Sequence, residues 1–207
     1  MRASTIIFKS MQDIRKTQDK AKKNPVGGHF DYGRQGTSTT HILQQILSKL
    51  EESYFTFLTP TGFGAVFLSI FSVTRPGDEI IAADPVYSPT RLLTQDFLKE
   101  FNIKTTFYDP HDLKTLEKAI TKKTKLIFVE NPWSNTFDFQ DLGKIVSIAK
   151  KHKILTAIDN TWGTPYFLKP IKLGFDMAIV SATKYYSGHS DVMLSLIHIW
   201  RCRRSYL

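Results

Sequence analysis

Met177-Ala178-Ile179-Val180-Ser181-Ala182-Thr183-Lys184-Tyr185 runs from four apolar residues into hydroxyl side chains and a lysine. A short apolar run of this kind predicts a buried strand, which we expect over residues 177–181. A lysine just past the end of a strand lies where α/β proteins gather their ligands. Because an isolated lysine is most often a solvated surface residue, Lys184 by itself does not predict chemistry.

A second apolar strand is expected over residues 154–159, and it ends in the carboxylate of Asp159. A lysine and an aspartate at the ends of separate strands are what a pyridoxal phosphate (PLP) site requires. The lysine forms a Schiff base with the cofactor, and the carboxylate keeps the pyridine nitrogen protonated. The pair of Lys184 and Asp159 therefore predicts such a site. A helix cap or turn cap is the alternative interpretation of Asp159.

Predicted strands and helices alternate along the middle of the chain. We expect strands over residues 79–83, 104–108, 125–130, 154–159 and 177–181, and helices over residues 90–100, 113–120 and 142–152. This alternation predicts a three-layer α/β/α domain with a mostly parallel sheet. Ligands of such sheets bind at the carboxyl ends of the strands. Four candidate residues end strands or lie just beyond them, namely Glu130, Asp159, Ser181 and Lys184.

A turn of small residues, Thr61-Gly62-Phe63-Gly64, precedes an apolar helix that we expect over residues 65–73. Backbone N–H groups at the start of a helix lack partners within the helix, and the helix dipole favours an anion there. The turn is therefore a candidate phosphate site. The alternative is a tight turn whose glycines permit positive φ angles.

The composition is that of an ordinary globular protein, with 207 residues, 42% hydrophobic and 23% charged side chains. The formal net charge of +9 would permit nucleic-acid binding, but the positive charge is scattered and no nucleic-acid-binding motif occurs. An excess of surface lysine is the simpler interpretation. With Cys202 as the only cysteine, an internal disulfide is excluded and a cytoplasmic setting is expected. No apolar run approaches the ~20 residues that span a bilayer, and no signal peptide is recognised.

Five motifs occur in order between about Arg2 and Met193. They are Tyr32-Gly33-Arg34-Gln35-Gly36-Thr37, Gly62-Phe63-Gly64-Ala65-Val66, Val86-Tyr87-Ser88-Pro89, Asp159-Asn160-Thr161-Trp162, and Ser181-Ala182-Thr183-Lys184-Tyr185 with Gly188-His189-Ser190-Asp191. With these motifs the chain resembles the cystathionine β-lyase branch of the PLP-dependent transsulfuration enzymes. The resemblance implies the large domain of a PLP-dependent transferase-like fold (fold type I, aspartate aminotransferase-like), present as an N-terminal fragment.

The resemblance implies roles for three residues around the cofactor ring. Lys184 would hold PLP as an internal aldimine and then move protons between Cα and the leaving group. Its amine must be neutral for this work, so we expect burial and nearby positive charge to favour the neutral form. Asp159 would pair with the pyridinium nitrogen. Tyr87 would stack on the ring, with ordinary packing as the alternative.

Further residues would hold the cofactor phosphate. The resemblance implies a cradle made of the backbone N–H groups of Gly62 and Phe63 and the hydroxyls of Ser181 and Thr183.

Tyr32 and Arg34 resemble a pair that reaches across a subunit interface to the phosphate of the neighbouring cofactor, since a forked guanidinium suits phosphate oxygens. Tyr32 would also serve in substrate activation, which makes it a candidate catalytic residue beside Lys184 and Tyr87. Each active site would then need two chains of a homo-oligomer, a homotetramer in the full-length family. A glycine-rich surface loop is the alternative interpretation.

The resemblance implies a PLP-dependent carbon–sulfur lyase of methionine biosynthesis. The full enzyme would remove the Cα proton of L-cystathionine or a related cysteine S-conjugate and expel the thiol (homocysteine) by β-elimination, leaving pyruvate and ammonia. A γ-lyase or γ-synthase is the close alternative, and a non-catalytic PLP-binding or interaction fragment is the alternative from another class. Glu130-Asn131-Pro132 and Ser134-Asn135 resemble the segment that approaches ring and substrate, without an assigned role. Neither nucleic acid nor membrane is expected as a partner.

Three parts are expected along the chain: an N-terminal segment with the subunit-crossing loop at residues 1–57, an incomplete PLP-binding domain at residues 58–193, and a tail at residues 194–207. The tail begins Leu194-Ser195-Leu196-Ile197-His198-Ile199-Trp200 and looks like a translated sequencing-library adapter in which an opal stop codon is read as Trp200. We therefore expect the native sequence to end at about Met193 and leave the non-native tail out of the fold prediction. A short membrane-binding tail is the competing interpretation.

The family's C-terminal domain, with the arginine that binds the substrate carboxylate, is expected to be missing. The spacing of His198 and Cys202 is what chance supplies, so no metal site is predicted.

Overall fold

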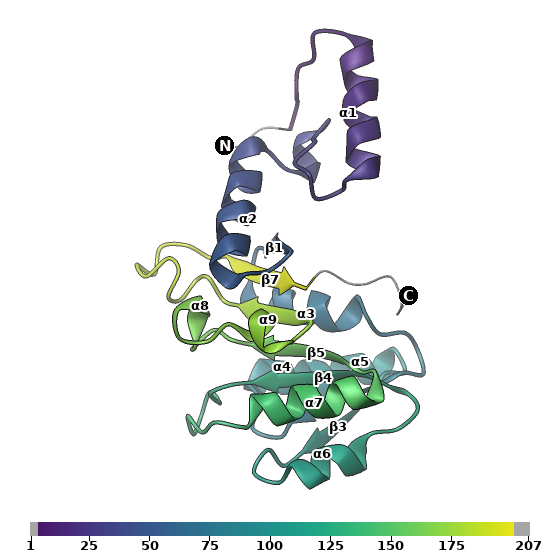
Figure 1. Ribbon diagram of the computed structural model, residues 1–207, viewed down its shortest axis with the longest axis vertical. Helices are drawn as coiled ribbons and strands as arrows, with labels where there is room; N and C mark the ends of the chain where they lie inside the picture. Colours follow the sequence, from purple (N-terminus) through teal and green to yellow (C-terminus); the bar gives the residue numbers. More distant parts are fainter. Residues whose placement is uncertain (1–3, 201–207) are drawn as a thin grey trace.

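The computed structural model describes residues 4–200, and Figure 1 shows them as one seven-stranded sheet covered by helices on both faces. The strand order is β1-β7-β6-β5-β4-β2-β3. The strands span Phe55–Thr59 (β1), Glu79–Ala83 (β2), Lys104–Tyr108 (β3), Thr124–Glu130 (β4), Leu155–Asp159 (β5), Met177–Val180 (β6) and Ser195–Ile199 (β7). Strands β2 to β6 pair in parallel, whereas β7 runs antiparallel to both β1 and β6. The predicted fold class, a three-layer α/β domain with a mostly parallel sheet, is confirmed.

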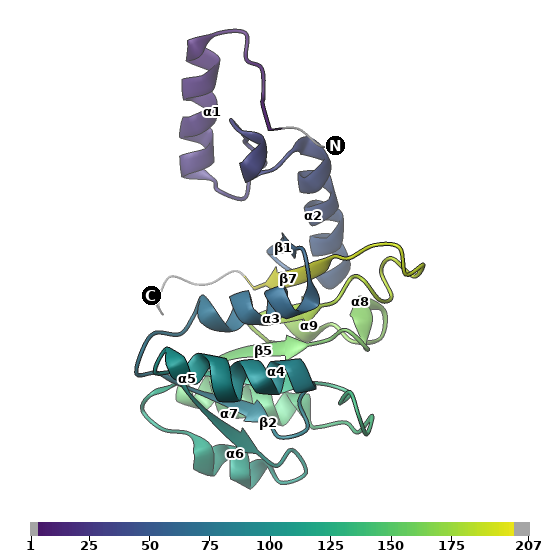
Figure 2. The ribbon, with the colours of Figure 1, turned by 180° about the vertical axis from the view of Figure 1, so that it is seen from behind.

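The helices are divided between the two faces of the sheet. Figure 2 shows α3 (Gly62–Phe71), α4 (Ser88–Leu92) and α5 (Leu98–Glu100) in front of the sheet, with a π-helical turn at Leu93–Phe97 between the last two. The opposite face carries α6 (Leu113–Ala119), α7 (Leu142–His152) and α9 (Pro170–Leu173), with the short α8 (Thr164–Phe167) near the end of β5. This arrangement is expected for parallel strands, whose crossover connections place helices on both faces.

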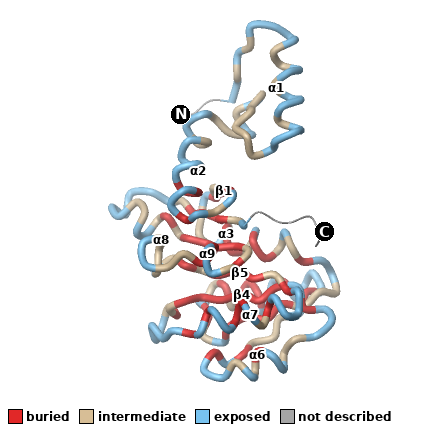
Figure 3. The backbone as a smooth tube through the Cα atoms, viewed as in Figure 1, coloured by how far each residue is buried: buried red, intermediate tan, exposed pale blue. Residues whose placement is uncertain are grey.

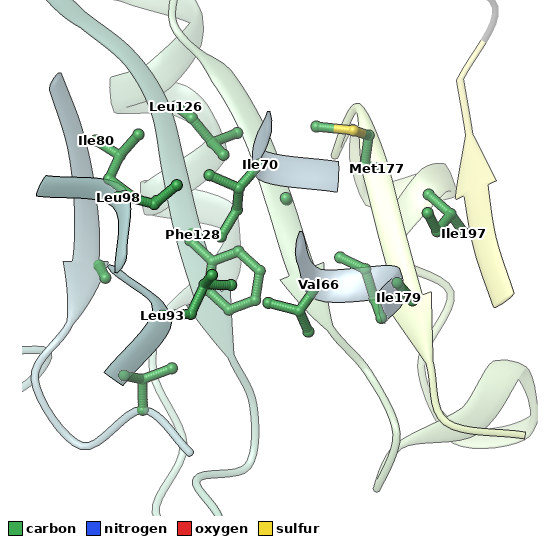
Figure 4. Close-up of a cluster of buried hydrophobic side chains, with 14 of the residues drawn as sticks. Val66, Ile70, Ile80, Leu93, Leu98, Leu126, Phe128, Met177, Ile179 and Ile197 are labelled. Atoms are coloured by element: carbon green, nitrogen blue, oxygen red, sulfur yellow. The ribbon is translucent and has the colours of Figure 1, made fainter. Parts of the chain in front are cut away.

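Each face of the sheet has its own apolar core because side chains alternate along every strand. On one side, Ile80 of β2 and Phe128 of β4 pack with α3, as Figure 4 shows. On the other side, Ile81 and Ile127 pack with α6 and α7. The central strands β2, β4 and β6 therefore contain runs of apolar residues, and these runs made them predictable from the sequence.

The N-terminal segment forms an arm that projects from this body. It contains α1 (Met11–Lys23), a single helical turn at Gly33–Gln35, and α2 (Ser38–Glu51), which leads to the sheet. No residue of α1 is buried, and Figure 3 shows the arm as mostly exposed or half-buried backbone. Apolar side chains of α2 are also exposed, with Ile42 at 55% and Ile46 at 53%. Nothing within the described part of the chain covers these side chains.

The sheet extends beyond the predicted large domain at both ends. Strand β1 begins at Phe55, so the predicted boundary after residue 57 falls inside a strand. Strand β7 spans Ser195–Ile199 and lies between β1 and β6, with Leu196 fully buried. The fold prediction left out residues 194–207, yet five of them form this strand, because their backbone pairs with both neighbours and Leu196 and Ile197 join the apolar cores. The adapter origin of the tail stays a prediction, and Cys202 lies outside the described residues.

Candidate active site

The predicted site residues gather at one edge of the sheet. Strands β4, β5 and β6 are neighbours and parallel, and they end at Glu130, Asp159 and Val180. Glu130 pairs in register with Asp159, so both side chains belong to the same face. Ser181 and Lys184 follow directly after β6. The structure thus brings together residues that lie up to 54 positions apart, from Glu130 to Lys184.

Asp159 presents one free carboxylate oxygen at this edge. Its Oδ1 accepts hydrogen bonds from the backbone N–H of Thr161 at 2.9 Å and from the Thr161 hydroxyl at 2.6 Å. Within the described residues, Oδ2 accepts no hydrogen bond. Burial raises the pKa of the Asp159 carboxyl, and the two bonds from Thr161 oppose that rise. A cationic N–H placed at Oδ2 would complete the pair and favour the carboxylate form.

Thr161 joins two parts of the site, a role that sequence reasoning did not assign. Its hydroxyl donates to Asp159 and accepts from the backbone N–H of Ser181 at 2.9 Å, which ties the end of β5 to the loop after β6. A hydroxyl two residues after an aspartate is a common turn motif, and this spacing was the available signal.

The start of α3 forms an anion cradle. The hydroxyl of Thr61 caps the helix by accepting from the N–H of Gly64 at 3.0 Å. The N–H groups of Gly62 and Phe63 have no acceptor in the described chain, as expected for the first turn of a helix. A Cβ added at Gly62 would lie 3.2 Å from the hydroxyl oxygen of Ser181, so a free hydroxyl stands beside these N–H groups. Together these donors and the helix dipole suit a phosphate.

Thr183 is engaged differently from the prediction. Its hydroxyl donates to the carbonyl oxygen of Leu194 at 3.1 Å and accepts from the Leu194 N–H at 3.1 Å. A phosphate contact by this hydroxyl would require that pairing to break. Of the two hydroxyls predicted for the cradle, Ser181 is therefore the one that is free.

Lys184 lies in a turn at the edge, and its side chain is exposed. Its backbone N–H donates to Ser181 at 3.0 Å, and its carbonyl accepts from Gly188 at 2.9 Å, which fixes the loop. The burial expected for the amine is not observed in this chain. Aromatic rings stand nearby, since the ring centroids of Tyr185 and Trp162 are 6.0 Å apart.

Tyr87 and Glu130 are joined by a direct hydrogen bond. The backbone N–H of Tyr87 donates to Oε2 of Glu130 at 2.6 Å. Burial raises the pKa of Glu130 to about 7, and the charge of Asp159 adds to the rise, while bonds from Ser134 and Tyr87 lower it. The ring of Tyr87 is 48% exposed and can receive a planar ligand.

Tyr32 and Arg34 do not reach this site in the same chain. Both are exposed residues of the arm, with the guanidinium carbon of Arg34 5.7 Å from the centre of the Tyr32 ring. Figure 1 shows that segment beside α1, on the far side of α2 from the sheet. Their contact with a neighbouring subunit stays a prediction.

A family model for Cys/Met metabolism PLP-dependent enzymes matches residues 1–203. The chain belongs to this family. A putative cystathionine beta-lyase of Saccharomyces cerevisiae is 37% identical over 195 residues, which cover 94% of this chain and 54% of the relative. The chain spans about half the length of the curated relatives that it matches.

Two solved structures share the fold of this chain. A cystathionine gamma-lyase from Lactobacillus plantarum, complexed with L-serine, superposes with a TM-score of 0.84 at 32% identity and covers 96% of this chain. A putative O-acetylhomoserine (thiol)-lyase from Campylobacter jejuni gives a TM-score of 0.86 at 31% identity and carries a pyridoxyl-lysine phosphate. This chain covers 48% of each of those chains.

PLP is the cofactor of the Cys/Met metabolism family, and the residues at the edge fit its three binding groups. The free Oδ2 of Asp159 matches a protonated pyridine nitrogen. The N–H groups of Gly62 and Phe63, with the hydroxyl of Ser181, match the phosphate. The exposed amine of Lys184 suits the aldehyde carbon of PLP, with which a lysine forms a Schiff base. Glycine at position 62 leaves the cradle open, because a Cβ there would crowd Ser181.

Proposed function

We propose that this chain is the cofactor-binding half of a carbon–sulfur lyase of the cystathionine β-lyase type. The full protein would release a thiol, such as homocysteine, from L-cystathionine or a related cysteine S-conjugate, leaving pyruvate and ammonia. The observation that supports this most directly is the unpartnered Oδ2 of Asp159, which shares a sheet edge with Lys184 and the Gly62 cradle.

Bound PLP would supply an electron sink for the negative charge that develops at Cα. In the proposed mechanism Asp159 keeps a proton on the ring nitrogen, because its carboxylate is the acceptor for that N–H. Gly62, Phe63 and Ser181 hold the phosphate and so fix the ring along its length. The amine of Lys184 takes the Cα proton and returns it to the leaving sulfur. The exposed turn around Lys184 gives that amine room to move between the two atoms.

Covalent capture of the cofactor tests the binding step. The 207-residue chain mixed with PLP is expected to develop a visible absorption band, and borohydride reduction is expected to place a pyridoxyl label on Lys184. Lys184→Ala should lose both signals while its far-ultraviolet circular dichroism stays unchanged. A folded wild-type chain that shows neither band nor label would overturn the proposal.

The products distinguish β-elimination from γ-elimination. The comparisons include both beta-lyases and gamma-lyases, so a γ-lyase is the second candidate. With L-cystathionine as substrate, the full-length protein is expected to release pyruvate. Release of 2-oxobutyrate instead would assign it to the γ-type. A chain of 207 residues that binds PLP without any turnover would favour a cofactor-binding fragment.

The protein is also proposed to act as a homo-oligomer in the cytoplasm. The exposed apolar side chains of α2 and the unburied arm support contact with a second copy. In the described part of the chain, no helix is long and apolar enough to cross a membrane.

A further inference from the structure

Glu130 is a buried acid at the site for which no role has been given. It is the last residue of β4, and only 3% of its surface is exposed. Acidic side chains are rarely buried to this degree unless they are paired with a cation. Glu130 forms no ion pair with any cation of the described chain, and its register neighbour is another acid, Asp159. An ion pair therefore does not explain why this acidic side chain is buried.

The carboxylate of Glu130 is held by two neutral donors from different segments. Its Oε2 accepts from the backbone N–H of Tyr87 at 2.6 Å. Its Oε1 accepts from the hydroxyl of Ser134, in the loop that follows β4. Oε2 is thus bound by the loop after β2, and Oε1 is bound by the loop after β4. The side chain is a bridge between the sheet and the Tyr87 loop.

Tyr87 depends on this bridge for its position. Within the described residues its side chain makes no hydrogen bond and no ring–ring contact, and it is 48% exposed. Its backbone has two ties, the N–H to Glu130 and the carbonyl that accepts from Arg91 at 3.0 Å in the first turn of α4. Of these two hydrogen bonds, only the one to Glu130 links Tyr87 to β4, which pairs with the strand that carries Asp159.

We propose that Glu130 is a positioning residue that holds Tyr87 over the ring of the cofactor bound at Asp159. The inference rests on the proposed function, because it places the cofactor ring between Tyr87 and Asp159. A hydrogen bond to a carboxylate is stronger than one to a neutral amide, so glutamate holds the Tyr87 N–H better than glutamine would. Ser134 fixes the rotation of the carboxylate and keeps Oε2 directed at Tyr87.

The charge on Glu130 changes near neutral pH, which gives the bridge a measurable signature. The titratable or polar groups that face it are Asp159 on β5, the Tyr87 N–H, and the hydroxyl and backbone N–H of Ser134. Burial raises the pKa of Glu130 to about 7, Asp159 adds to that rise, and the donors from Ser134 and Tyr87 oppose it. The Tyr87 N–H therefore loses its charged acceptor as the pH falls through this range.

The first experiment follows the hydrogen bond between the Tyr87 N–H and Glu130 in the absence of cofactor. In nitrogen–proton correlation spectra of the chain, the amide signal of Tyr87 is expected to shift with an apparent pKa near 7. Glu130→Gln should abolish that titration. Glu79→Gln is the matched control, since Glu79 also hydrogen-bonds through its carboxylate but lies at the opposite end of the sheet. A Tyr87 signal that titrates equally in Glu130→Gln would overturn the inference.

The second experiment is a double-mutant cycle on the dissociation constant for PLP. Glu130→Gln is expected to weaken PLP binding about tenfold when Tyr87 is present and less than about twofold in a Tyr87→Ala background. Independent, additive effects would show that Glu130 does not act through Tyr87. Equal PLP binding by wild type and Glu130→Gln would overturn this inference alone. Absence of PLP binding by the folded wild type would overturn the proposed function and the inference together.

Discussion

At the scale of single residues, the two carboxylate oxygens of Asp159 differ. Oδ1 accepts hydrogen bonds from Thr161, whereas Oδ2 accepts none within the described residues. Replacement by asparagine keeps the shape but removes the charge that holds a proton on a ring nitrogen. We expect Asp159→Asn in the full-length protein to retain PLP through the Gly62 cradle and to release pyruvate at least ~100-fold more slowly. Steady-state kinetics measures this effect.

The matched control for this prediction is Asp176→Asn. Asp176 also accepts from a threonine, with the Thr156 N–H at 2.8 Å and its hydroxyl at 2.9 Å, but it lies at the other end of β5. That variant is expected to lose stability and to keep its rate of turnover when folded. Equal loss of turnover in both variants would remove the special role of Asp159.

Glu51 makes the stability of the protein depend on pH. It is fully buried, and neither carboxylate oxygen has a hydrogen-bond partner in the described chain. Burial raises its pKa from 4.5 to about 8, with Lys169 opposing and Glu52 adding to the rise. Between these values the unfolded chain releases a proton that the folded chain keeps, so the free energy of unfolding falls as the pH rises.

We therefore expect the advantage of Glu51→Gln over wild type to grow by about 4 kcal/mol between pH 4 and pH 8, measured by urea unfolding. Glu52→Gln is the control, because Glu52 is exposed and paired with Lys169 at 2.6 Å, which lowers its pKa. A pH-independent difference between Glu51→Gln and wild type would contradict this account.

The residues of the site were predictable to different degrees. Lys184 and Asp159 could be found because each follows an apolar run that reads as a strand. The bonds from Thr161 to Ser181 and from Tyr87 to Glu130 could not, because their partners are 20 and 43 positions apart. Such contacts depend on strand order and register, which apolar periodicity does not determine.

At the scale of elements, a substitution at the start of α3 tests whether its first turn binds the cofactor phosphate. Gly62→Ala would place a Cβ 3.2 Å from the Ser181 hydroxyl, so we expect PLP affinity to fall about tenfold with little change in melting temperature. Gly143→Ala is the matched control in the first turn of α7, where the added Cβ would meet Asp141 at an ordinary 3.5 Å. Similar losses of affinity in both variants would contradict the cradle.

The strands of the parallel core were predicted to within one residue, whereas β1 and β7 were missed. Strands β2, β4 and β6 are buried at most positions and contain runs of apolar residues, which is a strong signal. Strand β1 has two threonines among its five residues, Phe55–Thr59, and so lacks a long apolar run. The segment of β7 was left out of the fold prediction because its sequence resembles a translated adapter, although its apolar residues would have suited a strand.

Removal of β7 tests whether it belongs to the sheet. Deletion of residues 194–207 would leave the edges of β1 and β6 without hydrogen-bond partners. Unpaired edges promote aggregation, so we expect the shortened chain to aggregate or to melt without a cooperative transition. Light scattering and thermal denaturation measure this. A monodisperse shortened chain with an unchanged melting temperature would show that the segment is dispensable.

At the scale of the whole molecule, the exposed arm predicts complementation between subunits. Consider mixed full-length oligomers of Lys184→Ala and Arg34→Ala chains. If Arg34 acts in the active site of the neighbouring subunit, the site of an Arg34→Ala chain keeps its own Lys184 and receives a native Arg34 from a Lys184→Ala neighbour. We expect such mixtures, after joint refolding, to recover roughly a quarter of the wild-type sites, measured by turnover. A mixture of Lys184→Ala with Asp159→Asn is the control, since both residues serve the same chain's site. No recovery in the first mixture would place Arg34 outside the active site.

The position of β7 in the sheet also has a consequence for synthesis of the protein. Phe55 of β1 pairs with Ile199 of β7, so β1 cannot complete its pairing until a segment that is synthesised much later has left the ribosome. Until then the apolar side of β1 and its unpaired backbone stay open to solvent, and long-range pairing of this kind slows folding. The nascent chain is therefore a natural client for chaperones that bind exposed apolar strands, up to the moment when β7 is released.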